Sequence, residues 1–174
     1  MKQAVFGIVG WKNSGKTTLT AALVSALTQR GFSIATLKHA HHSFDIDHEG
    51  TDSFRHRMAG AREVAIVSGK RWAIMHENER EEDEPSLAGL LARLSPCDLV
   101  LIEGFKRGDH PKLECRRRDA RDHAPLAKTC PNIVAIAADH ATEPGGLPVF
   151  RLHEVEAMAD FIIEHTGITR RSAL

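Results

Sequence analysis

The sequence predicts an α/β fold of three layers, in which helices cover both faces of a mostly parallel sheet and a β-hairpin forms an extension. Short apolar runs alternate along the chain with stretches whose apolar residues recur at helical spacing. A glycine-rich turn joins the first apolar run to the first helical stretch. Because the 174 residues contain no long linker, we expect a single domain over residues 1–174, with 169–174 as a frayed tail.

The chain opens with a strand, a glycine loop and a helix. Residues 4–9 are an apolar run of buried-strand type, and leucines recur at helical spacing until Gly31. Between them, residues 10–17 read G-W-K-N-S-G-K-T, which fits the phosphate-binding pattern G-x-x-x-x-G-K-[ST]. Backbone N–H groups and the positive end of the helix converge there on a polyphosphate. The fold is therefore expected to be of the P-loop NTPase type and to bind a nucleoside triphosphate.

Two side chains of this loop carry expected roles of their own. Lys16 is expected to reach the β- and γ-phosphates as a point charge, and it is one of two candidate catalytic residues. The Thr17 hydroxyl is expected to bind Mg²⁺.

The middle of the chain predicts a strand, a polar segment and shorter elements. A second strand is expected over residues 33–39, and a polar segment follows from Ala40 to Gly50. Thr51 or Asp52 is expected to cap a short helix that ends at Gly60. The next expected elements are a hairpin of residues 63–67 and 71–75, a solvated acidic loop of residues 79–84, and a helix whose leucine stripe runs from residue 87 to 94.

The last third of the chain predicts the remaining strands and a closing helix. Residues 98–104 give the strongest buried-strand pattern after the first run. Further strands are expected over residues 112–116, 133–138 and 148–152, the last at a sheet edge because it begins with proline. A helix that starts near Val155 and ends near Gly167 closes the fold.

The strand of residues 98–104 offers a second carboxylate to the metal. Glu103 follows the run, while Asp98 precedes it, and a strand rises about 3.3 Å per residue. Asp98 is therefore expected about 16 Å from Glu103, at the wrong edge of the sheet. We expect Glu103 to bind Mg²⁺ or orient water as the second candidate catalytic residue, and Gly104 to allow close backbone approach. The alternative is a strand-end glutamate that faces solvent.

A histidine-rich segment follows the second strand, and three interpretations of it stay open. Residues 38–48 hold four histidines and two aspartates, and Asp52 follows. The segment is a polar surface loop, a transition-metal site, or a switch-like segment that senses the γ-phosphate. Its position favours the third interpretation for His39 and Asp52. The roles of His41, His42 and His48 stay open.

The composition of the chain argues against several classes of protein and partner. Lysine plus arginine equals aspartate plus glutamate, 23 of each, which argues against broad binding to nucleic acid or anionic membranes. Three cysteines without C-x-x-C spacing indicate neither a disulfide framework nor a zinc knuckle. Without a signal peptide or a membrane-length apolar run, we expect a soluble cytoplasmic protein. Seven basic residues after Glu103 form either a docking patch for a phosphorylated molecule or acidic partner, or a solvated face: Lys106, Arg107, Lys112, Arg116, Arg117, Arg118 and Arg121.

The identity of the base stays open between ATP and GTP. The chain has no Asn-Lys-x-Asp sequence of the kind that reads guanine. Asp139, at the end of the run 133–138, is either a residue that accepts hydrogen bonds from a base edge or a turn residue. No glutamine or arginine is evidently placed to speed hydrolysis, so we expect slow turnover.

The chain resembles the MobB family of molybdopterin-guanine dinucleotide biosynthesis adapter proteins over nearly its whole length. The resemblance rests on G-W-K-N-S-G-K-T-T-L, on L-K-H-A-H-H-S-F-D-I-D followed by G-T-D-S and A-G-A, and on D-L-V-L-I-E-G-F-K. One departure is Glu49, where a proline is common in the family. This exchange alters the stiffness of the polar segment and leaves the nucleotide site untouched.

The resemblance implies a homodimeric GTP-binding protein with weak GTPase activity. Its implied partner is the molybdenum cofactor guanylyltransferase, which joins GMP to molybdopterin, and molybdopterin itself is an implied ligand. Glu103 and Gly104 match the family's second nucleotide-binding block, and Lys38, His39 and Asp52 match its signature. The residues that would hold the phosphates are Gly10, Trp11, Lys12, Asn13, Ser14, Gly15, Lys16, Thr17 and Thr18.

Two other functions compete with a GTP-dependent adapter. One is a P-loop small-molecule kinase, for which residues 116–121 would supply an arginine lid. The other is a metal-delivery GTPase that uses the histidine segment, and it ranks last because the histidines lack a complete ligand set by spacing alone.

Overall fold

The computed structural model describes residues 3–40 and 44–170 and divides the chain into two compact units. The first unit comprises residues 1–39 and 92–174, and the second comprises residues 40–91. The single domain expected over residues 1–174 stays a prediction; among the described residues, the hairpin strands pair with each other in a sheet of their own. His41, His42 and residues 171–174 of the expected tail lie outside the described residues.

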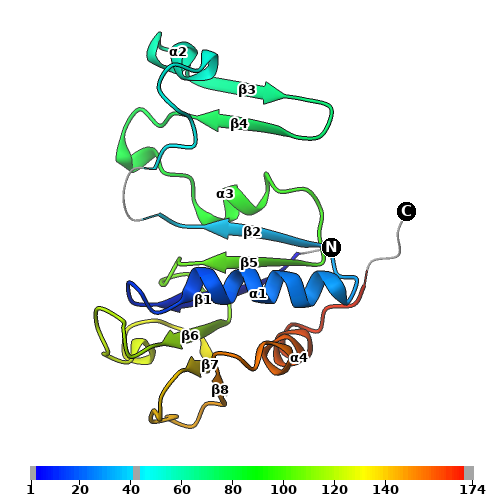
Figure 1. Ribbon diagram of the computed structural model, residues 1–174, viewed down its shortest axis with the longest axis vertical. Coiled ribbons are helices and arrows are strands. Elements are labelled where there is room, and N and C mark those ends of the chain that lie inside the picture. Colours follow the sequence, from blue (N-terminus) through cyan, green and yellow to red (C-terminus); the bar gives the residue numbers. More distant parts are fainter. Residues whose placement is uncertain (1–2, 41–43, 171–174) are drawn as a thin grey trace. The chain divides into compact units, whose positions relative to one another are not determined.

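The first unit is built on a six-stranded, fully parallel sheet (Figure 1). Its strand order is β2-β5-β1-β6-β7-β8, so β1 lies in the middle of the sheet between β5 and β6. The strands are β1 (Ala4–Gly10), β2 (Ile34–Lys38), β5 (Leu99–Glu103), β6 (Lys112–Arg116), β7 (Ile133–Ala138) and β8 (Val149–Arg151).

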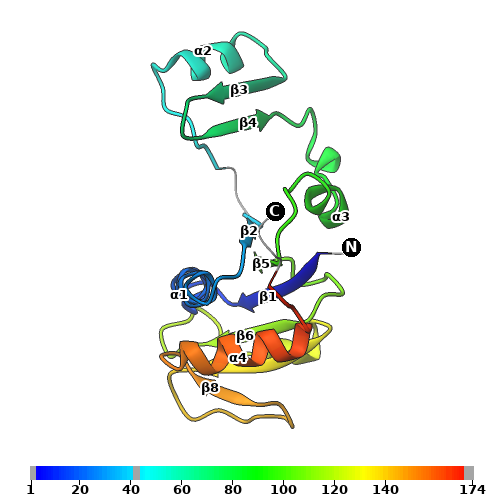
Figure 2. The same ribbon diagram turned by 90° about the vertical axis from the view of Figure 1, so that its right-hand side faces the viewer.

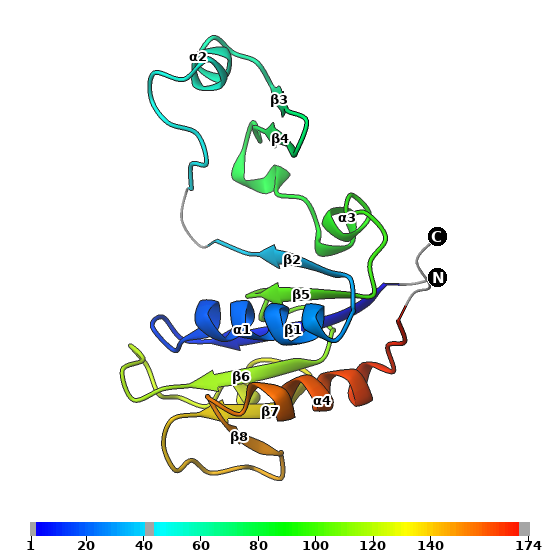
Figure 3. The same cartoon turned by 45° about the vertical axis from the view of Figure 1, so that its right-hand side comes forward.

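Two long helices cover one face of this sheet. Helices α1 (Lys16–Gln29) and α4 (Val155–Thr166) pack against each other and against the same buried residues of the strands (Figure 3). Leu23 and Leu27 of α1 are fully buried, and burial of such a side chain contributes about 1.5–3 kcal/mol. Arg30, just after α1, forms ion pairs with Glu156 and Asp160.

The opposite face of the sheet is covered in part by the segment between β6 and β7. There Val9 packs with Leu126 and Cys130, around the short 3₁₀ helix η2 (Leu126–Lys128). The segment between β6 and β7 contains Pro125 and Pro131, which oppose a regular helix. Within the described part of this unit, irregular chain rather than a long helix therefore covers that face.

The second unit contains an antiparallel strand pair and short helices (Figure 2). The predicted hairpin is present, with Val67 opposite Trp72 and a turn closed by the Ser68 N–H donating to the Arg71 carbonyl at 2.8 Å. Thr51 caps the helix that follows the polar segment by accepting from the Phe54 N–H. The elements are α2 (Asp52–Met58), β3 (Glu63–Val67), β4 (Trp72–His76), the 3₁₀ helix η1 (Glu81–Asp83) and α3 (Leu87–Leu91).

The helices of the structure are short. The leucine stripe forms α3 only from Leu87 to Leu91, although the helix was expected to reach residue 94. Within residues 3–40 and 44–170, every helix is too short or too polar to cross a lipid bilayer.

Candidate functional site

The loop between β1 and α1 follows a path that only glycine allows at two positions. A Cβ atom at Gly10 would lie 2.3 Å from the Ser14 hydroxyl oxygen and 2.6 Å from the Cys115 carbonyl oxygen. Gly15 has a φ of 86°, in the left-handed region, immediately before the first residue of α1. The first N–H groups of a helix have no partner within that helix. The tight loop therefore brings unpaired donors and the positive end of α1 to one place.

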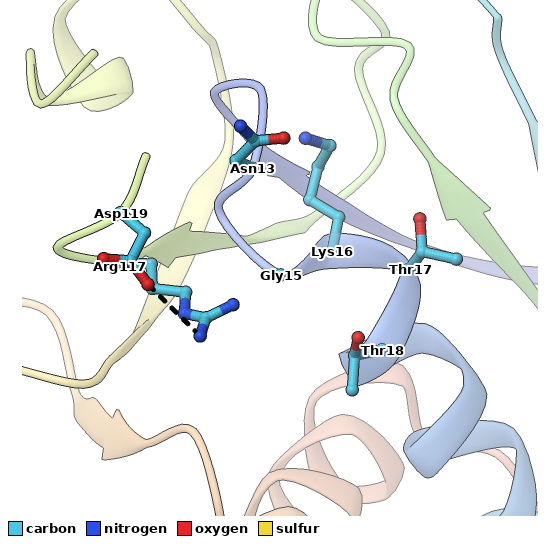
Figure 4. Close-up of a pocket in the computed structure, with 7 residues that line it drawn as sticks. All are labelled: Asn13, Gly15, Lys16, Thr17, Thr18, Arg117 and Asp119. Carbon is cyan, nitrogen blue, oxygen red and sulfur yellow. Dashed lines mark ion pairs between the residues drawn. The ribbon is translucent and has the colours of Figure 1, made fainter. Parts of the chain in front are cut away.

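A cavity of about 430 Å³ opens beside this loop. In Figure 4, Arg117 and Asp119 lie across it from Thr17 and Thr18. The lining combines loop residues with the segment that follows β6: Asn13, Gly15, Lys16, Thr17, Thr18, Arg117 and Asp119.

Lys16 bridges the loop. Its Nζ donates to the Trp11 carbonyl oxygen at 2.7 Å. Burial lowers the pKa of Lys16 below its usual value, and the negative charge of Glu103 opposes this shift. The ammonium group is thus held next to the N–H groups of the loop, where it adds positive charge for an anion.

Glu103 lies at the same edge of the sheet as the loop, as expected. The parallel register places it opposite Ile8, two residues before Gly10. Its buried carboxylate accepts from the Thr17 hydroxyl at 2.9 and 3.1 Å, and the Lys38 ammonium lies 3.6 Å from Oε1. Two oxygen donors side by side fit Mg²⁺, which prefers hard oxygen ligands.

Asp98 lies at the other end of β5 and has a structural partner. Its Oδ2 accepts from the Ser33 N–H at 2.7 Å and from the Ser33 hydroxyl at 2.8 Å. The aspartate therefore fixes the turn that leads into β2. Of these two carboxylates, only that of Glu103 lies beside the glycine loop, and its role at a metal stays a prediction.

His39 and Gly104 approach each other beside Glu103. The His39 N–H donates to the Glu103 carbonyl at 2.9 Å, and its ring lies 4.5 Å from that of Phe105. Gly104 has a φ of 99°, and a Cβ atom there would come within 3.1 Å of the His39 Cβ. The predicted close backbone approach at Gly104 is therefore an approach to the chain after β2.

Three predicted phosphate-binding residues direct their side chains or carbonyls elsewhere. Trp11 Nε1 donates to the Ala124 carbonyl at 2.8 Å, and the Lys106 ammonium lies 4.2 Å from the Trp11 ring centre. The Lys12 carbonyl accepts from the Arg121 N–H, and the Ser14 side chain is fully buried. These residues shape the loop, and the cavity is lined by others.

A second cavity, of about 310 Å³, adjoins the first and contains Asp139. Oδ1 of Asp139 accepts from the Arg118 N–H at 3.0 Å and lies 2.7 Å from His140 Nδ1. Burial alone would raise the pKa of Asp139, but these hydrogen bonds and the nearby Arg117 charge lower it. The lining residues are Gly15, Thr18, Leu19, Ala22, Arg117, Asp139 and Leu152.

The expected basic patch after Glu103 is not one surface. Lys112 is fully buried in the central strand β6, and its Nζ donates to the carbonyls of Gly108, His110 and Pro131. Arg116 is mostly buried and pairs with Glu114 at 2.9 Å. The docking interpretation is therefore wrong for these two residues, and Arg116 is anchored rather than placed on a mobile lid.

Arg117 is a site residue that the sequence did not identify individually. It lines both cavities, although its sequence context showed only a run of basic residues. Its position in the chain could have identified it, because Arg117 directly follows β6, and β6 pairs with β1. Residues at the carboxyl ends of neighbouring parallel strands converge on the same edge.

Asp52 and the polar segment belong to the second unit. Asp52 is the first residue of α2. Oδ1 of Asp47 accepts from the hydroxyls of Thr51 and Ser53 at 2.7 and 2.9 Å, and Arg57 pairs with Asp45 at 2.8 Å. The D-I-D and G-T-D-S blocks thus fasten the polar segment to α2. Within residues 3–40 and 44–170, no cluster of three or more histidine, cysteine or acidic side chains is arranged to hold a metal ion.

The chain is similar to one family of known proteins over most of its length. The family described as molybdopterin guanine dinucleotide synthesis protein B, MobB, matches residues 5–139. The molybdopterin-guanine dinucleotide biosynthesis adapter protein of Escherichia coli K12 is 37% identical over 165 residues, which cover 92% of this chain and 91% of that protein. The adapter protein of Haemophilus influenzae is 34% identical over 158 residues, with 91% and 86% covered.

Solved structures show the same architecture. The crystal structure of a MobB homologue from Bacillus stearothermophilus matches with a TM-score of 0.68 and 28% identity, and covers 94% of this chain and 97% of the other. A structure of molybdopterin-guanine biosynthesis protein B matches with a TM-score of 0.70 and 28% identity, with 92% and 99% covered. The predicted α/β fold with a mostly parallel sheet is confirmed.

Proposed function

The chain belongs to the molybdopterin guanine dinucleotide synthesis protein B family, and from this premise we propose that it is a GTP-binding adapter in molybdopterin-guanine dinucleotide biosynthesis. In this proposal it assists the guanylyltransferase that attaches GMP to molybdopterin. It acts in the cytoplasm as a homodimer and hydrolyses GTP slowly.

The observation that carries the proposal is the pairing of Thr17 with Glu103 beside the glycine loop. A hydroxyl and a carboxylate 2.9 Å apart supply oxygen ligands for Mg²⁺ at the first turn of α1. The N–H groups of the loop and the Lys16 ammonium supply the positive environment for the phosphates. Thr17 and Glu103 would hold the Mg²⁺ ion, which would supply positive charge against the phosphates.

Asp139 supports guanine as the base. Its lowered pKa keeps the carboxylate ionised at neutral pH, and an ionised carboxylate only accepts hydrogen bonds. Guanine presents two adjacent donors, N1–H and N2–H, on its pairing edge, whereas adenine presents an acceptor at N1 beside its single N6 amino donor, so a carboxylate matches the guanine edge better. An acceptor in the second cavity therefore favours GTP over ATP.

Slow hydrolysis follows from the lining of the first cavity. Among the described residues, this lining contains Asn13, Lys16 and Arg117 but no glutamine that would orient an attacking water. Such a protein is suited to bind GTP and present a bound state to a partner enzyme.

Calorimetry with GTP and ATP, each with and without Mg²⁺, tests the nucleotide part of the proposal. We expect stoichiometric GTP binding that strengthens with Mg²⁺ and exceeds ATP binding, together with slow phosphate release. GTP-dependent retention on the immobilised guanylyltransferase tests the adapter part. Fast multiple turnover without the partner, or equal retention with and without GTP, would contradict the proposal.

A further inference from the structure

We propose that Arg117 binds the nucleoside end of the nucleotide by stacking its guanidinium plane on the base. This inference rests on the proposed GTP binding and adds a residue that determines how the base is held. Arg117 extends from the chain after β6, and its Cδ lies 3.9 Å from the position that a Cβ on Gly15 would occupy. The side chain therefore passes next to the glycine loop.

The two cavities share part of their lining at Arg117. Gly15, Thr18 and Arg117 line both. A nucleotide whose phosphates lie on the loop in the first cavity reaches the second cavity by passing these three residues. Arg117 consequently lies where the phosphate chain gives way to the ribose and base.

The second cavity has the chemistry of a base pocket. Leu19, Ala22 and Leu152 give it an apolar wall, and Asp139 adds an acceptor. Pockets for flat, largely apolar groups with a polar edge combine these two features. The first cavity has no such apolar wall among the described residues, because polar residues and one glycine line it.

Two carboxylates fix the orientation of the Arg117 guanidinium. Its NH2 group lies 3.4 Å from Asp119 Oδ2, and its Nε lies 3.6 Å from Asp139 Oδ2. Arginine held along its edge by carboxylates keeps the face of its plane available to stack on an aromatic ring.

The pairing of Arg117 with Asp139 also argues against a role at the γ-phosphate. Lys16, Thr17 and Glu103 meet at one side of the loop. Arg117 shares the first cavity with Lys16 and Thr17 and pairs there with Asp119, but its Nε pairs with Asp139, which lines only the second cavity. We therefore assign Arg117 to the base rather than to the transferred or hydrolysed phosphate.

Calorimetry on Arg117→Ala and Arg117→Lys with three ligands tests this assignment. Arg117→Ala is expected to weaken GTP and GDP equally, by roughly tenfold, while leaving inorganic tripolyphosphate binding unchanged. Arg117→Lys keeps the charge but not the plane, so it is expected to restore only part of the affinity. Arg93→Ala, which removes an exposed arginine before β5, is the matched control and is expected to bind all three ligands like the wild type.

Each other outcome overturns the assignment in a distinct way. A loss for GTP but not for GDP would place Arg117 at the γ-phosphate. An equal loss for tripolyphosphate, or full rescue by lysine, would reduce its role to general electrostatics. Wild-type affinity in Arg117→Ala would remove the role altogether, whereas wild-type protein that fails to bind GTP would overturn the proposed function itself.

Discussion

The Thr17 hydroxyl donates to the Glu103 carboxylate at 2.9 Å, although 86 residues separate the two in sequence. The parallel pairing of β1 with β5 creates this contact, because it sets the carboxyl ends of both strands side by side. The acid therefore stands beside the first turn of α1.

Replacing Glu103 by glutamine is expected to weaken Mg²⁺-dependent GTP binding at least about tenfold, since interactions with a charged group contribute about 1.5–3 kcal/mol. The comparison variant is Asp98→Asn, which replaces the carboxylate that accepts two Ser33 hydrogen bonds by a neutral amide. It is expected to cost about 1–2 kcal/mol of unfolding free energy and to leave Mg²⁺ dependence intact. Calorimetry measures the Mg²⁺-dependent GTP affinity of each variant, and urea unfolding measures its stability. A larger loss of Mg²⁺-dependent affinity in Asp98→Asn than in Glu103→Gln would contradict the proposed site.

Lys16→Ala is expected to reduce GTP affinity by about a hundredfold, because it removes a cation from the phosphate cradle. The folded state should tolerate the change, since Nζ donates to one loop carbonyl, that of Trp11. Titration calorimetry and thermal unfolding of the same sample separate the two effects. Unchanged affinity in a folded variant would show that the nucleotide binds elsewhere.

Asp139→Asn is expected to abolish discrimination between GTP and inosine triphosphate. Inosine lacks the N2 amino group, so the wild type should prefer GTP by roughly tenfold through a hydrogen bond to the ionised carboxylate. The ratio of the two dissociation constants is the measurement. A wild-type ratio near unity would mean that the carboxylate does not contact the base edge.

Arg57→Leu is expected to release the polar segment from α2. Arg57 is mostly buried and pairs with Asp45 and Glu77, and hydrogen bonds to both carboxylates raise its pKa. Hydrogen exchange should become faster across residues 44–58 and stay unchanged in β1 and β5. Lys70→Leu, in the exposed turn between β3 and β4, is the control and should leave exchange in residues 44–58 as it is.

His110 predicts a loss of stability on mild acidification. Burial, with a contribution from Lys112, lowers its pKa from an ordinary value of 6.5 to about 4. Between these values the unfolded chain binds a proton that the folded chain does not, so stability falls as pH falls. Partial solvent exposure limits the effect to about 1–2 kcal/mol. Urea unfolding at pH 7 and pH 5 should show this loss in the wild type and a smaller one in His110→Gln.

The positions of the glycine loop and of Glu103 were predictable from motif spacing, apolar patterns and strand direction. The loop combined a spaced motif with an apolar strand before it and helical spacing after it. Glu103 followed from strand direction alone, since parallel strands end at a common edge. Motif spacing and the pattern of apolar residues depend only on residues that are close in sequence, so they can be read before the fold is known.

The missed features depend on contacts that local patterns do not encode. Lys112 looked like a surface charge, yet its ammonium finds three carbonyls inside a central strand. Arg117 was one basic residue among several until β6 placed it beside the loop.

Gly7, in the middle of β1, limits the size of the side chains that positions 7, 110 and 112 can hold together. A methyl group there would come within 2.6 Å of the His110 ring and 2.9 Å of the Lys112 side chain. An alanine at position 7 therefore requires both the His110 ring and the Lys112 side chain to shift or to be replaced by smaller groups. Substitutions at position 7 are thus coupled to those at positions 110 and 112, because the space for a larger residue in β1 must come from these two side chains.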